Sequence, residues 1–90
     1  MDLVSVIIPS HNRYDNLLNA INSVKQQTYK NYEIIVVDDG SKDSRYKNNI
    51  HNVKIINLPQ SSKEILGYPC GAVPRNEGMR NSNGTYIAFL

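Results

Sequence analysis

The sequence predicts an α/β fold with a mostly parallel sheet of about four strands, packed against helices. Short apolar runs alternate with amphipathic or polar segments along the whole chain of 90 residues. One run, Ile34–Val37, is four β-branched residues long and is typical of a strand buried on both faces. Strands that alternate with helices are joined by right-handed crossovers, which place the strands parallel in one sheet.

The first half of the chain is expected to form a strand, a helix and a second strand. The strands are expected at 4–8 and 33–37, where the apolar runs lie. Asn12 is expected to cap the helix between them, with Asp15 three residues later in capping-box position. The apolar face of this helix is formed by Leu17, Leu18, Ile21 and Val24.

The second half is expected to add a short polar helix, a strand, a loop, a helix and a final strand. These segments are expected at 41–49, 53–58, 60–71, 74–83 and 85–90. Ser41 can cap the polar helix, and Tyr46 and Ile50 are its apolar anchors. Gly78 is expected where the last helix lies against another element, and Gly84 is expected to stop that helix. The final strand is expected to be buried, because it is apolar almost throughout.

Composition excludes several classes of protein. The formal net charge is +2 and the basic residues are scattered, so neither a nucleic-acid partner nor an acidic membrane surface is indicated. Cys70 is the single cysteine, which rules out an intramolecular disulfide and fits a reducing compartment. No secretion signal is apparent, and no apolar run approaches the roughly 20 residues of a transmembrane helix. A cytoplasmic protein, free or at the cytoplasmic face of a membrane, is therefore expected.

Two adjacent acids, Asp38 and Asp39, follow the second strand directly and precede Gly40 and Ser41. Ligands of open α/β sheets bind just past the carboxyl ends of the strands, so these acids lie where a ligand would bind. Neighbouring side chains on an extended chain point to opposite sides, so one acid is expected to face the ligand. Alternatively, one of them caps the next helix or pairs with a lysine.

The first strand ends in the same way, because Pro9, Ser10, His11 and Asn12 form a polar turn after its apolar run. His11 can stack against a base and also adds a titratable group. Alternatively, His11 is a surface residue of the turn without a role.

Arg75 is the best basic candidate for a ligand contact. Its expected place near a helix start combines a guanidinium with free backbone N–H groups, which suits a diphosphate. Alternatively, Arg75 is a surface residue that pairs with Glu77 or Glu64.

Together these segments resemble the start of a family 2-type glycosyltransferase with the GT-A fold, an inverting class that uses nucleotide sugars. The resemblance covers nearly the whole chain, in the family's order and at roughly its spacing. It is carried by Ser5–Arg13, Gln27–Tyr29, Glu33–Ser41 with Asp43, Arg75–Gly78 and Gly84–Leu90. It implies a three-layer, Rossmann-like GT-A sheet and a role in polysaccharide biosynthesis.

The resemblance also implies which residues bind the nucleotide, namely Pro9, Ser10, His11, Asp38, Asp39, Arg75 and Asn76. Asp39 matches the family's acid that contacts the uracil or the ribose, whereas Asp38 is expected to hold the loop. His11 stands where the family usually has an aromatic residue against the base. Arg75 and Asn76 match an Arg-Asn pair of the family.

In the whole enzyme, the resemblance implies that an acceptor hydroxyl attacks the anomeric carbon of a nucleotide sugar, with inversion. It also implies that this nucleotide sugar is UDP-linked. An aspartate would act as the general base, and Mg²⁺ or Mn²⁺ would offset charge on the diphosphate. The family's metal-binding acidic motif would follow the final strand directly. Residues 1–90 are therefore expected to be the N-terminal nucleotide-binding part of the domain, without catalytic or metal-binding residues and inactive alone.

Two other interpretations start from the same residues. A non-enzymatic α/β module, such as a phospho-receiver domain, also has adjacent acids at a strand end. It needs a further aspartate at the end of the third strand, where this chain has Ile55–Leu58. The apolar final strand also predicts an exposed sheet edge, which a second copy of the chain can cover as a homo-oligomer.

Overall fold

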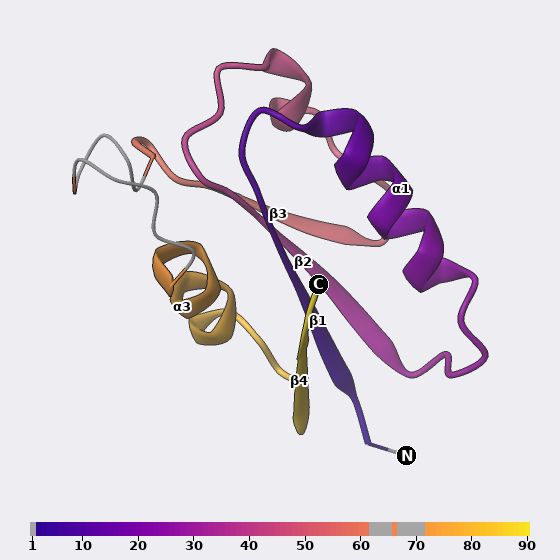
Figure 1. Cartoon of the computed structure of the whole chain (residues 1–90). Helices are drawn as coiled ribbons and strands as arrows, with labels where there is room; N and C mark the ends of the chain where they lie inside the picture. Colours follow the sequence, from indigo (N-terminus) through magenta and orange to yellow (C-terminus); the bar gives the residue numbers. More distant parts are fainter. Residues whose placement is uncertain (1, 62–65, 67–71) are drawn as a thin grey trace.

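The computed structural model describes residues 2–61, 66 and 72–90, and its elements are labelled in Figure 1. Four parallel strands form one sheet in the order β3-β2-β1-β4. The strands are β1 (Val4–Ser10), β2 (Tyr32–Asp38), β3 (Val53–Asn57) and β4 (Tyr86–Phe89). The expected α/β fold with a parallel sheet is confirmed.

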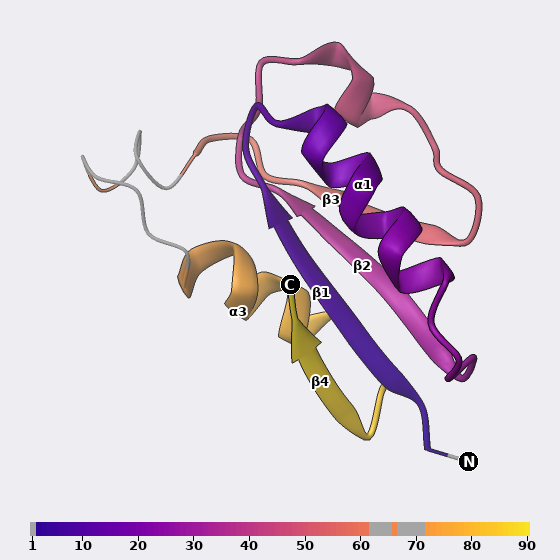
Figure 2. The ribbon, with the colours of Figure 1, turned by 45° about the vertical axis from the view of Figure 1, so that its right-hand side comes forward.

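The sheet is the middle of three layers, with α1 (Tyr14–Lys25) on one face and α3 (Ala72–Arg80) on the other (Figure 1 and Figure 2). Successive side chains of each strand point to opposite faces, so the sheet has two apolar sides. α1 packs on one side through Tyr14, Leu17, Ile21 and Val24, which are buried. The periodicity expected for this helix is confirmed.

On the opposite side of the sheet, Ile7, Ile35 and Val37 are fully buried. α3 approaches this side at Gly78, where a Cβ atom would be 2.5 Å from Ile7 Cγ2. Only a residue without a side chain fits at that distance. The close contact expected for Gly78 is therefore confirmed.

The starts of the first two helices differ from their expected form. Asn12 does not cap α1, because its side chain bonds to the chain after β2 and its φ angle is 51°. The expected polar helix is a single 3₁₀ turn, η1 (Ser44–Lys47), capped by Asp43 rather than by Ser41. It is short because Tyr46 is the one buried side chain that it contributes.

The end of α3 and the burial of β4 also differ from expectation. α3 ends at Arg80, before the expected position 83, because Asn81 and Ser82 donate to carbonyls three residues back. β4 pairs with β1 and has no second strand partner among the described residues. Its side chains are therefore not buried, and that of Tyr86 is 60% exposed.

Most of the loop expected at 60–71, including Cys70, lies outside the described residues. Among the residues that the structure describes, no helix is long and apolar enough to cross a membrane.

Candidate functional site

The carboxyl ends of β1 and β2 lie side by side and carry two polar turns. We call residues 9–13 the β1 turn and residues 38–42 the β2 turn. Ser10 is the strand partner of Asp38, and the Asp39 amide donates to the Ser10 carbonyl at 2.8 Å. Parallel pairing thus brings together the two sequence motifs that were expected to meet a ligand.

His11 is attached to the β2 turn through its ring. Its Nδ1 atom lies 2.8 Å from the carbonyl oxygen of Asp39. Because a carbonyl only accepts, Nδ1 carries the hydrogen and Nε2 is left as an acceptor. The side-chain Nδ2 of Asn12 lies 3.3 Å from that Nε2. The imidazole is therefore held in one orientation while it remains exposed to solvent.

Asp38 and Asp39 face different surroundings, as expected for neighbours on an extended strand. Asp38 is 1% exposed, and its two carboxylate oxygens accept from the Ser41 amide at 2.8 Å and from Asn57 Nδ2 at 2.9 Å. Asp38 therefore holds the β2 turn in place. Asp39 is half-buried next to the His11 ring.

Gly40 allows the β2 turn to pack against the chain that follows β3. Its φ angle is 67°, in the left-handed region, and a Cβ atom would collide with the backbone of Gln60 and Ser61. The Leu58 amide donates to the Asp38 carbonyl at 2.9 Å. The start of the loop after β3 is thus fixed beside the same turn.

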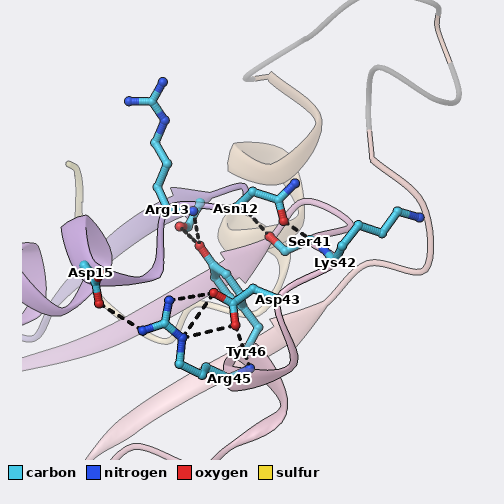
Figure 3. A network of polar contacts seen from close by, with 9 residues as sticks. Asn12, Arg13, Asp15, Ser41, Lys42, Asp43, Arg45 and Tyr46 are labelled. Carbon is cyan, nitrogen blue, oxygen red and sulfur yellow. Dashed lines mark hydrogen bonds and ion pairs between the residues drawn. The ribbon is translucent and has the colours of Figure 1, made fainter.

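Asn12 and Ser41 join the two turns directly (Figure 3). The Asn12 amide donates to Ser41 Oγ, and Asn12 Oδ1 accepts from the Lys42 amide, each at 2.8 Å. These bonds explain why Asn12 is unavailable as a helix cap. They make the β1 and β2 turns one rigid unit rather than two independent loops.

Tyr46, expected only as an apolar anchor, is also a polar residue of this site. It is 1% exposed, and its hydroxyl contacts Ser10 Oγ and accepts from the Arg13 amide at 3.0 Å. Its backbone carbonyl accepts from Asn57 Nδ2 at 3.1 Å. The signal in the sequence was a lone aromatic residue within the polar segment 41–49.

Arg45, the neighbour of Tyr46, is engaged by acids on both sides (Figure 3). Its guanidinium pairs with Asp43 at 2.7 Å and with Asp15 at 3.0 Å, and it lies 4.7 Å from the centre of the Tyr14 ring. The hydrogen bonds with Asp43 raise the pKa of Arg45 and lower the pKa of Asp43. This cation therefore links η1 to the start of α1.

Arg75 and Asn76 lie elsewhere, exposed on α3. The Arg75 guanidinium lies 5.9 Å from the centre of the Phe89 ring in β4. No interaction between described residues joins this pair to the β1 or β2 turn. Arg75 is on the surface, as its alternative interpretation expected, but among the described residues Glu77 pairs with Arg80 at 3.2 Å and not with Arg75. Glu64, the other expected partner, lies outside the described residues.

A pocket of about 420 Å³ opens beside the β1 turn on the α1 side of the sheet. Its lining residues come from β1, its turn, α1 and the chain after β4, namely Ile8, Pro9, Ser10, His11, Arg13, Asn16, Leu17, Ala20 and Leu90. Pro9, Ser10 and His11 are thus accessible from one hollow. Among the described residues there is no group of three or more His, Cys, Asp or Glu side chains that can hold a metal ion.

Residues 5–90 match the family described as "Glycosyl transferase family 2". One relative, an uncharacterised glycosyltransferase of Rickettsia conorii, is 41% identical over 97% of this chain and 14% of its own length. WfaP of Escherichia coli, described as a UDP-Glc:alpha-D-GlcNAc-diphosphoundecaprenol beta-1,3-glucosyltransferase, is 39% identical over 100% of this chain and 35% of its own length. The chain thus spans about a third or less of these relatives.

Solved structures give the same result. The crystal structure of residues 1–349 of Staphylococcus aureus TarS superposes on all of this chain with a TM-score of 0.77 and 28% identity, and the chain covers 27% of it. The same TarS segment in complex with UDP-GlcNAc has a TM-score of 0.74 and 30% identity, with 26% of it covered. The expected resemblance and the GT-A fold are confirmed, and the receiver-like alternative is not supported.

Proposed function

Because this chain belongs to glycosyl transferase family 2, we propose that its β1 and β2 turns bind the nucleotide of a UDP-sugar donor. The observation that carries this proposal is the contact between His11 and the Asp39 carbonyl. It joins the exposed His11 ring to the backbone of Asp39, a half-buried acidic residue, at the carboxyl ends of two parallel strands. A ring face suits a nucleobase, and a carboxylate suits ribose hydroxyls or a base N–H.

Each turn has a different role in this proposal. Asp39 accepts hydrogen bonds from the ribose or the uracil, while Asp38 acts indirectly by holding Asp39 in place. His11 stacks on the base, and Pro9 and Ser10 line the pocket beside it. Arg75 and Asn76 are proposed as contacts to the diphosphate, reached from the exposed side of α3.

The choice of uridine is supported by relatives rather than by a bound ligand. The E. coli relatives WfaP and WfgD, 39% and 36% identical, are named for transfer from UDP-Glc to a diphosphoundecaprenol-linked sugar. TarS crystals contain UDP or UDP-GlcNAc. We propose a UDP-sugar donor on this basis, and a lipid-linked acceptor that would place the protein at the cytoplasmic face of a membrane.

The reaction of the whole protein is proposed to be attack of an acceptor hydroxyl on the anomeric carbon of the donor, with inversion. The new glycosidic bond forms as the bond from that carbon to the UDP oxygen breaks, so UDP leaves. The hydroxyl proton passes to a general base that lies outside residues 1–90. We assign no catalytic residue within this chain. A divalent metal is common in this family, but the described residues do not fit one. No step is therefore assigned to a metal here, and residues 1–90 alone are proposed to bind the nucleotide without transferring sugar.

The direct test is calorimetric titration of the protein with UDP, with and without Mn²⁺, in wild type and Asp39→Asn. The substitution keeps the shape of the side chain but removes its charge, so UDP should bind at least about tenfold more weakly. Asp2→Asn, at the opposite end of β1, is the matched control and should bind as wild type does. Mn²⁺ should change the affinity of residues 1–90 little.

Equal UDP affinity in wild type and Asp39→Asn would contradict the role of Asp39. A folded wild-type protein that binds no UDP would overturn the proposed function of these turns.

A further inference from the structure

We infer that Tyr46 is a positioning residue for the nucleotide site, because its hydroxyl orients Ser10 as a hydrogen-bond donor toward the bound ligand. This inference depends on the proposed function for its ligand. The contacts of Tyr46 can be tested without that ligand.

The hydrogen-bond directions at the Tyr46 hydroxyl follow from its burial. The Arg13 N–H can only donate, so the phenol oxygen accepts there at 3.0 Å. Tyr46 is 1% exposed, so its own O–H hydrogen needs a protein acceptor. Ser10 Oγ is the partner that the structure places beside it. The phenol hydrogen is therefore donated to Ser10.

Ser10 is left with a free hydrogen by this arrangement. Its oxygen accepts from Tyr46, so its O–H points to another acceptor. Ser10 is half-buried and lines the 420 Å³ pocket beside His11. The chain of donors runs from the Arg13 amide through Tyr46 and Ser10 into that pocket. A ligand with a carbonyl or phosphate oxygen, as in a uridine nucleotide, supplies the acceptor.

Tyr46 is itself held from two other directions. Asn57 Nδ2, in β3, donates to the Tyr46 carbonyl at 3.1 Å and to Asp38 Oδ2, in β2, at 2.9 Å. Asn57 thus fixes the Tyr46 backbone and is itself fixed by Asp38. The Tyr14 ring packs edge-on against the Tyr46 ring, with centres 5.2 Å apart. A hydroxyl on such a fixed ring can orient its neighbour, whereas a mobile one cannot.

Tyr46→Phe removes the hydroxyl and keeps the ring in its packing. We expect UDP to bind about fivefold more weakly, because the Ser10 hydroxyl is then free to rotate. Tyr14→Phe is the matched control, since it deletes a hydroxyl from the same ring pair. Among the described residues that hydroxyl takes part in no hydrogen bond, so UDP affinity should stay unchanged.

A double-mutant cycle separates positioning from general stability. If Tyr46 acts through Ser10, then Tyr46→Phe should weaken UDP binding no further when Ser10→Ala is already present. If Tyr46→Phe instead acts only on stability, its fold-loss of UDP affinity should multiply with the fold-loss caused by Ser10→Ala. Independent losses of UDP affinity in the double variant would overturn the inference, and so would an unchanged UDP affinity in Tyr46→Phe.

A second readout does not need UDP. Hydrogen exchange of the Arg13 amide should be faster in Tyr46→Phe than in wild type or Tyr14→Phe, because its acceptor is gone. Wild type that binds no UDP would overturn the proposed function, and the exchange rate would still decide the contact. Unchanged Arg13 exchange would overturn the positioning role outright.

Discussion

Two adjacent aspartates, Asp38 and Asp39, have different roles at this site. Both are acidic, yet Asp38 is 1% exposed and both of its carboxylate oxygens accept hydrogen bonds within the protein. Asp39 is half-buried, and its backbone carbonyl meets the exposed His11 ring. The difference follows from the alternation of side chains along a strand. A substitution at Asp38 should therefore damage folding first, and one at Asp39 should damage binding first.

Gly40 is the residue whose backbone makes this turn possible. Gly40→Ala should lower the free energy of unfolding by about 2 kcal/mol or more, because it adds both a left-handed strain and a backbone collision. Urea denaturation measures the change. Asn52→Ala is the control, since Asn52 is exposed and has a φ angle of 60°. It should cost about 1 kcal/mol from backbone strain alone, and equal losses in both variants would contradict the collision.

At the scale of elements, a partly buried polar cluster attaches the chain that enters β4 to the rest of the sheet. Ser5 is fully buried in β1; its hydroxyl donates to Glu33 of β2 and accepts from the Gly84 amide at 2.8 Å. Glu33 also accepts from the Asn83 amide at 2.7 Å. β1, β2 and the chain that enters β4 thus meet at the Glu33 carboxylate, near the amino ends of the strands. Gly84 serves this contact rather than stopping α3, which ends earlier.

This cluster predicts a pH dependence of stability. Burial alone would raise the pKa of Glu33, but hydrogen bonds from Ser5 and Asn83 and the charge of Lys54 lower it below the ordinary value of 4.5. A lowered pKa in the folded protein stabilises it above the unfolded pKa, and this stabilisation is lost as pH falls through the folded pKa. Glu33→Gln should therefore flatten the fall in stability below about pH 5.

Thermal unfolding of wild type and Glu33→Gln between pH 3 and 7 measures this difference. The two curves should converge at acid pH, where Glu33 is protonated in both states. Curves that stay parallel over the whole range would mean that Glu33 contributes no linked proton.

At the scale of the whole molecule, local patterns predicted the layers but not the contacts between turns. Burial can be predicted from a few neighbouring residues in two places: the β-branched run Ile34–Val37 and the helical spacing of Leu17 and Ile21. Tyr46 instead acts through Ser10 and Arg13, which are 36 and 33 residues away in the chain. Such partners meet only after the sheet forms, so a single sequence carries no local signal for them.

The exposed edge of the whole sheet leads to a last prediction, that this chain self-associates through β4. Ile87 and Phe89 are 40 and 45% exposed, and no charged residue interrupts the strand. Ile87→Lys places a charge on that edge and should shift the protein toward monomer, because charged edge residues oppose strand pairing. Sedimentation equilibrium of the wild type and the variant measures this, with Met79→Lys on α3 as the control. A wild-type chain that stays monomeric at high concentration would show that β4 does not mediate self-association.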